Sequence, residues 1–216
     1  MTEILKKNKL YFTIYAFILL SMLVVAILTD KGSGVIMFDT YRQRPLDIFF
    51  MAATKIGEYY TYLVFIFFFL FIRKSYRSAL SIAVMGTLLP LISYMLKMYF
   101  KHPRPLTYFS KYIDYKDFHG IENLHYHTGH NSFPSGHTFA AFALFTFLAL
   151  RSKNKAYGIL YLSIALLVGI SRIYLSQHFI EDVAFGSILG VLYGTFTYYV
   201  FFISHNFRGL KFVSKK

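Results

Sequence analysis

The chain has 216 residues, of which 56% are hydrophobic and 20% aromatic, and this composition is typical of a polytopic membrane protein rather than a soluble one. It contains no cysteine, which excludes disulfide bonds, thiolate metal sites and cysteine nucleophiles. A net charge of +13 would suggest nucleic-acid binding in a soluble protein, so its distribution along the chain decides its meaning.

Six apolar runs follow one another, each near the ~20 residues that a helix needs to cross a bilayer core. We expect helices at about 10–29, 48–72, 79–100, 134–150, 156–174 and 182–204, with a long outer loop over 101–133. The first run follows basic residues as in a signal peptide, but it is long enough to span and no cleavage site follows it. The sequence predicts an all-α fold: one domain over residues 1–216, built as a six-transmembrane-helix bundle.

Two of these runs carry further signals. The second run contains Lys55 and Glu58 near its start, so we expect that end to lie at the membrane interface. In the sixth run a glycine recurs every four residues, at Gly186, Gly190 and Gly194. This spacing lets another helix approach closely, and packing within the chain is favoured over a dimer face.

The basic residues divide unevenly between the two sides of the predicted bundle. Of the 23 basic residues, 13 lie on the short segments that share a side with the termini, together with one acid, Glu3. They are Lys6, Lys7, Lys9, Arg73, Lys74, Arg77, Arg151, Lys153, Lys155, Arg208, Lys211, Lys215 and Lys216. This positive-inside bias predicts an integral plasma (inner) membrane protein with both termini in the cytoplasm, and nucleic acid is not needed as a partner.

Three polar segments then fall together on the outer side. Lys97 and Arg104 end the third run, Pro134-Ser135-Gly136-His137 opens the fourth, and Ser171-Arg172, His178 and Asp182 join the fifth to the sixth. Each could be an interfacial residue, a helix cap or a helix pair by itself. Because ionisable groups beside a bilayer usually have a role, finding all of them at adjacent helix ends favours a functional site.

The residue types suit transfer of a phosphoryl group, which needs positive charge on the nonbridging oxygens, a nucleophile and a proton for the leaving oxygen. Lys97, Arg104 and Arg172 supply fixed positive charge. The backbone N–H groups of Ser135 and Gly136 precede an apolar helix, where they can face an anion.

Two histidines remain for the chemistry. His178 and Asp182 are four residues apart, so on a helix the carboxylate would bond one ring nitrogen and leave the other free to attack phosphorus. His137 remains as the acid for the leaving group and then as the base for water. This scheme requires no metal and no cofactor.

At these residues the chain closely resembles the type 2 phosphatidic acid phosphatase superfamily of membrane lipid phosphatases. The signature of that superfamily is matched in order from Lys97 to Pro105, from Pro134 to His137 and from Ser171 to Asp182. The resemblance implies that His178 is a nucleophile forming a phosphohistidine, assisted by Asp182, and that His137 is the general acid. It implies a phosphate cradle of Lys97, Arg104, Ser135, Gly136 and Arg172. The soluble vanadium haloperoxidases share this pocket, but six apolar runs favour the membrane branch.

The expected function is metal-independent dephosphorylation of a membrane lipid phosphate or pyrophosphate at the outer membrane face. Candidate substrates are phosphatidylglycerol phosphate, phosphatidic acid, undecaprenyl pyrophosphate and lipid A phosphates, and the lipid is expected to reach the site between the third and sixth helices. The alternatives are a lipid-to-lipid phosphotransferase with the same pocket and a non-enzymatic lipid transporter. The sequence leaves the native lipid and the oligomeric state open.

Two further local features, a histidine cluster and a glutamate beside Asp182, each allow more than one interpretation. His125, His127 and His130 in the outer loop could form a metal site, but no carboxylate lies among them, so interfacial polar residues are the favoured interpretation. Glu181 adjoins Asp182, and because adjacent residues of a helix point in different directions we expect it to face away from the site.

Overall fold

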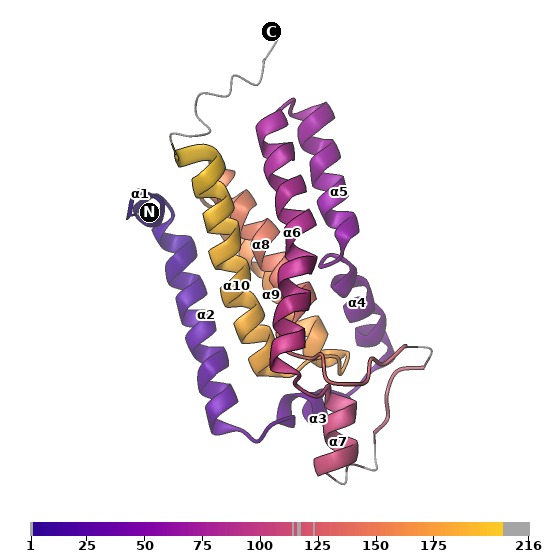
Figure 1. The fold of residues 1–216 in the computed structure, drawn as a ribbon. Coiled ribbons are helices and arrows are strands. Elements are labelled where there is room, and N and C mark those ends of the chain that lie inside the picture. Colours follow the sequence, from indigo (N-terminus) through magenta and orange to yellow (C-terminus); the bar gives the residue numbers. More distant parts are fainter. Residues whose placement is uncertain (1, 114, 116–117, 123, 205–216) are drawn as a thin grey trace.

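The computed structural model describes residues 2–113, 115, 118–122 and 124–204, and its described elements are all helical (Figure 1). They are α1 (Thr2–Lys7), α2 (Lys9–Leu28), α3 (Ser33–Thr40), α4 (Arg44–Lys55), α5 (Tyr59–Phe67), α6 (Tyr76–Phe100), α7 (Pro105–Tyr112), α8 (Gly136–Arg151), α9 (Tyr157–Tyr174) and α10 (Ile180–Tyr198). Two π-helical turns, η1 (Phe68–Ile72) and η2 (Tyr199–Ile203), extend α5 and α10. The all-α prediction is confirmed.

Helix α8 forms the centre of the bundle. Every residue from Thr138 to Leu150 is buried, which is expected for a helix that is apolar on all sides. Helices α9 and α10 make the most extensive contacts with it. The first turn of α8 is therefore held rigidly by its neighbours, and this turn carries His137.

Glycines let α10 lie directly against α8. A Cβ atom at Gly190 would lie 2.8 Å from the Phe139 carbonyl oxygen and 2.9 Å from the Ala143 backbone nitrogen. Gly186 and Gly194 face the same helix in the same way. The expectation that the repeated glycines pack within the chain is confirmed, and this close contact fixes α10, which begins just after His178.

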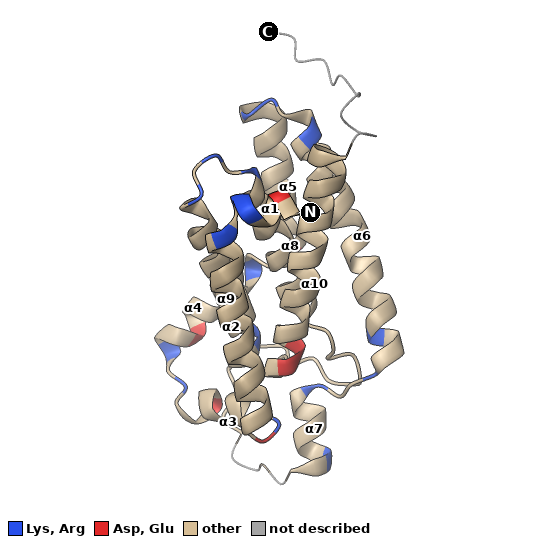
Figure 2. Ribbon diagram, turned by 90° about the vertical axis from the view of Figure 1, so that its left-hand side faces the viewer, with Lys and Arg blue, Asp and Glu red and all other residues tan. Residues whose placement is uncertain are grey.

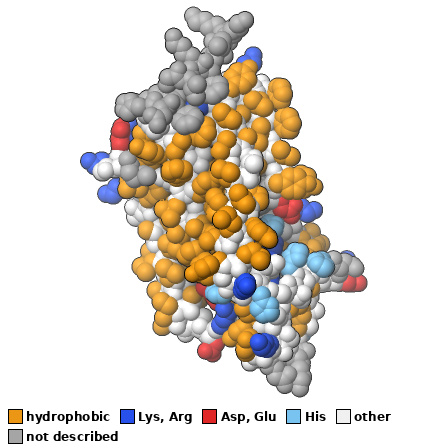
Figure 3. All heavy atoms as spheres, in the orientation of Figure 1, with side chains coloured by type: hydrophobic (Ala, Val, Ile, Leu, Met, Phe, Trp, Pro, Cys, Tyr) orange, Lys and Arg blue, Asp and Glu red, His pale blue; other side chains and the backbone are white. Residues whose placement is uncertain are grey.

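Helix α2 has the opposite environment. It is long and apolar, yet among its residues only Tyr11 and Tyr15 are buried. Their hydroxyls lie 2.7 Å from Thr146 Oγ1 and 3.2 Å from Ser187 Oγ and so attach α2 to the core. Figure 3 shows apolar side chains spread over the middle of the molecule, with histidine side chains gathered toward the α7 end. This apolar face suits contact with lipid tails.

The second predicted span is not one helix, which corrects the expectation of a single helix over 48–72. Helices α4 and α5 are separated at residues 56–58 and are bent by 56° relative to each other. Among the described residues four helices are long and apolar enough to cross a membrane; the bent pair could supply a fifth span, and α8 is a shorter apolar helix. The other predicted runs agree with the observed helices to within a few residues.

Charge separates the two ends of the bundle. Figure 2 shows Lys and Arg gathered at the end where α1 lies, which includes the connections before α6 and after α8. The three polar motifs lie at the opposite end, near α3 and α7 (Figure 1). The predicted basic tail residues Arg208, Lys211, Lys215 and Lys216 lie outside the described residues.

Candidate active site

The three motifs meet at one end of the bundle beside a cavity of about 970 Å³. Lys97 comes from the last turn of α6, Gly136 and His137 from the first turn of α8, and Arg172 from the last turn of α9, and all four line the cavity. The other predicted site residues, Arg104, Ser135, His178 and Asp182, are buried at 5% exposure or less. The structure therefore brings the predicted residues of all three motifs into one region.

His178 and Asp182 form the predicted pair, but His178 does not lie on a helix. It precedes α10, whose N-cap is Phe179, and the pair forms because the chain turns into the helix at this point. His178 Nδ1 lies 3.4 Å from Asp182 Oδ2. The same carboxylate oxygen accepts hydrogen bonds from the Phe179 backbone N–H at 2.9 Å and from the Ser132 hydroxyl. Asp182 thus orients the ring and is itself held by two further donors.

The surroundings of His178 favour a neutral imidazole. Burial lowers the pKa of His178 well below its ordinary value, and the positive charges of Arg104, Arg172 and Lys97 lower it further. A neutral ring that donates from Nδ1 to a carboxylate has a free electron pair at Nε2. This is the protonation state that a nitrogen nucleophile requires.

The two arginines are held by different partners. Arg104 Nε donates to Asn131 Oδ1 at 2.8 Å, and its Nη1 donates to the Gln177 carbonyl at 3.1 Å. Arg172 Nη1 donates to Thr54 Oγ1 at 2.6 Å, while its buried Nε has no partner among the described residues. A buried guanidinium with a free N–H beside a cavity is suited to bind an anion.

One predicted anion contact is not available. The backbone N–H of Ser135 donates to the Asp182 carbonyl at 3.1 Å, and its hydroxyl lies 2.9 Å from Thr138 Oγ1. This corrects the expectation that the Ser135 N–H faces an anion. Ser135 instead joins the second motif to the third, and of the two residues expected to present backbone N–H groups only Gly136 lines the cavity.

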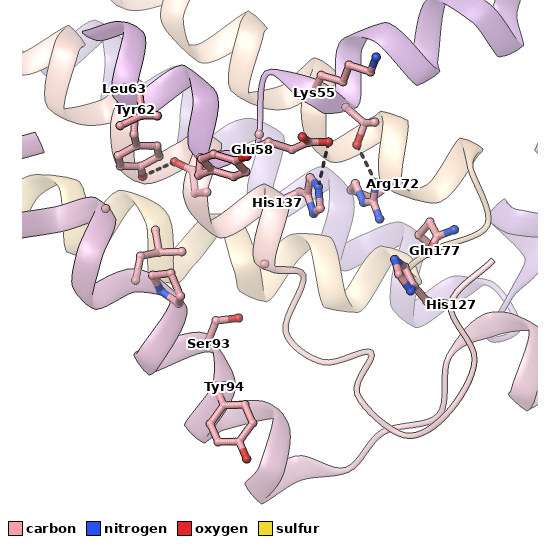
Figure 4. A pocket seen from close by; sticks show the side chains of 18 of the residues that line it. Lys55, Glu58, Tyr62, Leu63, Ser93, Tyr94, His127, His137, Arg172 and Gln177 are labelled. Atoms are coloured by element: carbon pink, nitrogen blue, oxygen red, sulfur yellow. Dashed lines mark hydrogen bonds and ion pairs between the residues drawn. The ribbon is translucent and has the colours of Figure 1, made fainter. Parts of the chain in front are cut away.

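His137 faces a carboxylate that the motifs do not contain. Its Nε2 lies 3.9 Å from Glu58 Oε1, and both side chains are about one-third exposed, at 33% and 32% (Figure 4). Glu58 is the N-cap residue of α5, at the bend between α4 and α5. Glu58, which was expected at the membrane interface near the start of the second run, thus lines the cavity.

The cavity continues from the polar end along the apolar helices. Beyond Lys97 and His137 it is bounded by side chains of α5 and α6, among them Tyr62, Leu63, Ile66, Leu89 and Pro90. No residue of α10 lines it within the described part of the chain. The open space therefore lies between α5 and α6, and the path between the third and sixth spans stays a prediction.

A second polar cluster supports the segment that precedes His178. Arg42 Nη2 donates to the Tyr174 carbonyl at 3.2 Å and forms an ion pair with Asp39 at 3.1 Å. Burial would raise the pKa of Asp39, but the backbone N–H groups of His119 and Gly120, the Tyr115 hydroxyl and the charge of Arg42 together hold that pKa below its usual range. Asp39 therefore connects α3 and the outer loop to the end of α9.

The outer loop contains a short helix, α7, that was not predicted from the sequence. His125 and His127 line the cavity with ring centroids 5.1 Å apart. Within the described residues no group of three His, Cys, Asp or Glu side chains is arranged to hold a metal ion. Glu181 forms an ion pair with Lys31 at 3.1 Å and is not among the cavity residues, which confirms that it faces away from the site.

Several site residues were missed by sequence reasoning. Asn131 and Ser132 lie three and two residues before Pro134, and Gln177 immediately precedes His178, so their positions near motif residues were an available signal. Thr54 and Glu58 had no such signal, because 118 and 79 residues separate them from Arg172 and His137.

With this geometry in place, comparison with known proteins decides the family. The model of the PAP2 superfamily matches residues 78–205, which is more than half of the chain. The chain belongs to the PAP2 superfamily. The match includes all three motifs and ends close to the last described residue.

Individual relatives agree with this assignment. A lipid A 4'-phosphatase of Porphyromonas gingivalis is 36% identical over 140 residues, which is 62% of this chain and 57% of the relative. Phosphatidylglycerophosphatase B of Bacillus subtilis is 34% identical over 56% of this chain and 57% of its own length. The chain thus matches a little over half of the length of these curated relatives.

A solved structure extends the similarity over most of the fold. The transmembrane PAP2-type phosphatidylglycerolphosphate phosphatase of Bacillus subtilis superimposes with a TM-score of 0.62 and 27% identity, covering 87% of this chain and 93% of that one. LpxE of Aquifex aeolicus gives a TM-score of 0.60 and 26% identity, covering 76% and 91%. The helical arrangement is therefore that of a membrane-embedded PAP2 protein.

Proposed function

We propose that this protein removes phosphate from a membrane lipid phosphate or pyrophosphate through a phosphohistidine on His178, without a metal. The observation that carries the proposal is the buried His178–Asp182 pair, at 3.4 Å, beside three fixed cations at the polar end of a cavity that continues between apolar helices. The cations would neutralise the nonbridging oxygens, which is the principal electrostatic demand of phosphoryl transfer.

In the first step, His178 Nε2 attacks phosphorus while Asp182 accepts the Nδ1 proton in a hydrogen bond. A nitrogen–phosphorus bond forms as the bond from phosphorus to the lipid oxygen breaks, and His137 gives that oxygen a proton. Lys97, Arg104 and Arg172 hold the transferring group, and of these Lys97 and Arg172 line the cavity.

In the second step, water attacks the phosphohistidine. His137, now neutral, accepts a proton from this water, the nitrogen–phosphorus bond breaks, and its electron pair returns to His178 Nε2. Inorganic phosphate leaves, and the site regains its starting protonation state. The next turnover can therefore begin without a cofactor.

The shape of the cavity supports a lipid substrate that approaches from within the bilayer. The phosphate would lie near Lys97 and His137, and the apolar chains would lie between α5 and α6, along Leu63, Ile66 and Leu89. The names of relatives make lipid A phosphates and phosphatidylglycerol phosphate the first substrates to test. Phosphatidic acid and undecaprenyl pyrophosphate complete the panel.

The charge distribution supports an orientation for this site. The basic connections lie at the end of the bundle opposite the motifs (Figure 2), so the positive-inside rule would place the termini in the cytoplasm and the site at the outer face. The protein would then act on lipids of the outer leaflet of the plasma membrane.

The test is phosphate release by the purified protein from each lipid of the panel, with and without a chelator. We expect chelator-resistant release from at least one lipid, and its loss in His178→Ala although the variant still inserts and unfolds at the wild-type temperature. Full turnover by His178→Ala, or loss of wild-type release with chelator, would contradict the proposal. Transfer of phosphate to an added lipid with little free phosphate would instead identify a phosphotransferase.

A further inference from the structure

The bend between α4 and α5 contributes contacts that lie outside the three motifs and outside the family match, which begins at residue 78. Thr54 on the last turn of α4 accepts a hydrogen bond from Arg172 at 2.6 Å. Glu58 at the start of α5 places its carboxylate 3.9 Å from His137 Nε2. Both contacts reach residues that the motifs supply, so the bend forms a fourth side of the site (Figure 4).

Gly57 explains why the bend comes so close. A Cβ atom at this position would lie 2.7 Å from Val168 Cγ1 and 3.0 Å from the His137 carbonyl oxygen. Only a residue without a side chain lets the backbone rest against the first turn of α8 in this way. The close approach brings the start of α5 beside the first turn of α8, where the Glu58 carboxylate lies 3.9 Å from His137 Nε2.

The charges that face His137 are otherwise positive. They come from Lys97 of α6, Arg104 of the segment after α6 and Arg172 of α9, beside the titratable ring of His178. Lys55 at the end of α4 and the rings of His125 and His127 in the outer loop also line the cavity. Among the described residues Glu58 is the only carboxylate within 4 Å of the His137 ring nitrogens. Burial of the His137 ring is the largest influence against its protonation and the nearby cations add to it, whereas a nearby carboxylate favours protonation.

We propose that Glu58 is a positioning residue that keeps a proton on His137, so that His137 can deliver it to the leaving lipid oxygen. The inference rests on the proposed function and adds a residue to it. Without Glu58, the three cations that bind the phosphate would also discourage protonation of the group that must act as the acid. The negative charge of Glu58 counteracts the cations at His137, which must be protonated, while the nucleophile His178 remains neutral.

The proton balance is simple. Glu58 stays a carboxylate throughout and accepts the hydrogen bond of the protonated His137 ring as the two side chains close up. When the bond between phosphorus and the lipid oxygen breaks, the His137 proton moves to that oxygen and the ring becomes neutral. Attack of water on the phosphohistidine returns a proton to His137 beside Glu58.

The experiment compares Glu58→Gln with wild type on two substrates, a lipid phosphate and 4-nitrophenyl phosphate. A lipid alkoxide needs a proton to leave, whereas 4-nitrophenolate leaves without one, so the first-turnover release of each alcohol isolates the acid step. We expect first-turnover release of the lipid alcohol to fall about 10-fold, the effect of about one pKa unit on the acid, and nitrophenolate release to change less than about 2-fold. KM for the lipid should not rise, because a negative charge beside the phosphate cradle has been removed.

The pH profile gives an independent readout. Without the carboxylate, His137 loses its proton more easily, so the alkaline limb of lipid-alcohol release should move to lower pH by about one unit. Glu58→Asp retains a carboxylate and should keep most of the wild-type profile. Glu181→Gln makes the same chemical change in a residue that pairs with Lys31 away from the cavity, and should leave both substrates unaffected.

Equal losses on the two substrates, or an unchanged alkaline limb in Glu58→Gln, would overturn the inference. Equal losses in Glu58→Gln and Glu58→Asp would also overturn it, because they would indicate a packing role. These results differ from a failure of the proposed function, which would appear as phosphate release that survives in His178→Ala. Thermal unfolding of each variant separates loss of activity from loss of fold.

Discussion

Two histidine–carboxylate pairs lie in the same site, but they have contrasting environments. The side chains of His178 and Asp182 are 2% and 0% exposed, whereas those of His137 and Glu58 are 33% and 32% exposed. The buried pair is joined at 3.4 Å and supported by Ser132. The open pair is 3.9 Å apart and lines the cavity.

The difference matches two chemical tasks. A nucleophile must be held in one orientation and one protonation state, and burial with extra hydrogen bonds to Asp182 achieves this. A group that donates a proton and then accepts one must reach the leaving oxygen and then water, so it must face the cavity. This contrast supports the proposal that the buried pair carries out the attack and the open pair transfers the proton.

The largest effect should come from the carboxylate of the buried pair. Asp182→Asn removes the charge that stabilises the ring and disturbs the choice of tautomer, and we expect kcat for phosphate release to fall about 10³-fold or more. Steady-state release from the preferred lipid measures this. Both the lipid and 4-nitrophenyl phosphate should be affected equally, in contrast to Glu58→Gln.

A loss in Asp182→Asn no larger than that in Glu58→Gln would remove the distinction between the two pairs. Because Asp182 also accepts the Ser132 and Phe179 hydrogen bonds, thermal unfolding of the variant must be measured beside its activity. A variant that is folded at the assay temperature makes the comparison valid.

Arg172 lies near both histidines, so its replacement should affect both pairs together. Arg172→Lys retains the charge but loses the planar fork that donates to Thr54, and we expect kcat/KM to fall about 10²-fold on both substrates. Arg151→Lys, at the other end of the bundle, is the matched control and should remain active. A loss confined to the lipid substrate would place Arg172 with the open pair alone.

Ser132 tests the support of the buried pair. Ser132→Ala removes the hydroxyl that donates to Asp182 Oδ2, and loss of one hydrogen bond to a charged group should lower kcat about 10-fold. Ser187→Ala removes a comparably buried hydroxyl beside Tyr15 and should leave kcat unchanged. Wild-type kcat in Ser132→Ala would show that Asp182 holds His178 without this donor.

The smallest expected effect is that of mild acid on the nucleophile. Since the pKa of His178 lies well below its ordinary value of 6.5, the ring stays neutral as the pH falls through 6.5 and becomes charged only at lower pH. After correction for ionisation of the phosphate ester near pH 6, kcat/KM for 4-nitrophenyl phosphate should show no acid limb near 6.5. An acid limb near pH 6.5 in the wild-type profile that is absent from the profile of Asp182→Asn would contradict a neutral His178 surrounded by cations.

Most of the site could be predicted from sequence because its residues lie in short motifs at the ends of apolar runs. The pair of His178 and Asp182 depends on a spacing of four residues, which the start of α10 preserves even though His178 itself precedes the helix. The apolar runs gave the helices to within a few residues because hydrophobic length determines where a chain can span. Local signals were sufficient for these features.

The open pair could not be predicted in the same way. Glu58 reaches His137 only because the second span bends by 56° and Gly57 rests against α8, and both depend on packing between segments far apart in sequence. The predicted role of the Ser135 N–H failed for a similar reason, since Asp182 O accepts that hydrogen bond in the folded chain. The path between α5 and α6 likewise depends on which helices leave space between them.

The most direct test of the central claim is to trap the phosphorylated protein. Wild type, His137→Ala and His178→Ala are mixed with lipid substrate or with 4-nitrophenyl phosphate, each carrying radioactive phosphate, then quenched in alkali within the first turnover and examined for phosphate bound to protein. We predict an alkali-stable, acid-labile phosphoprotein that maps to His178, accumulates in His137→Ala with a good leaving group, and is absent from His178→Ala. Phosphate release without such an intermediate, or an intermediate on another residue, would contradict the account.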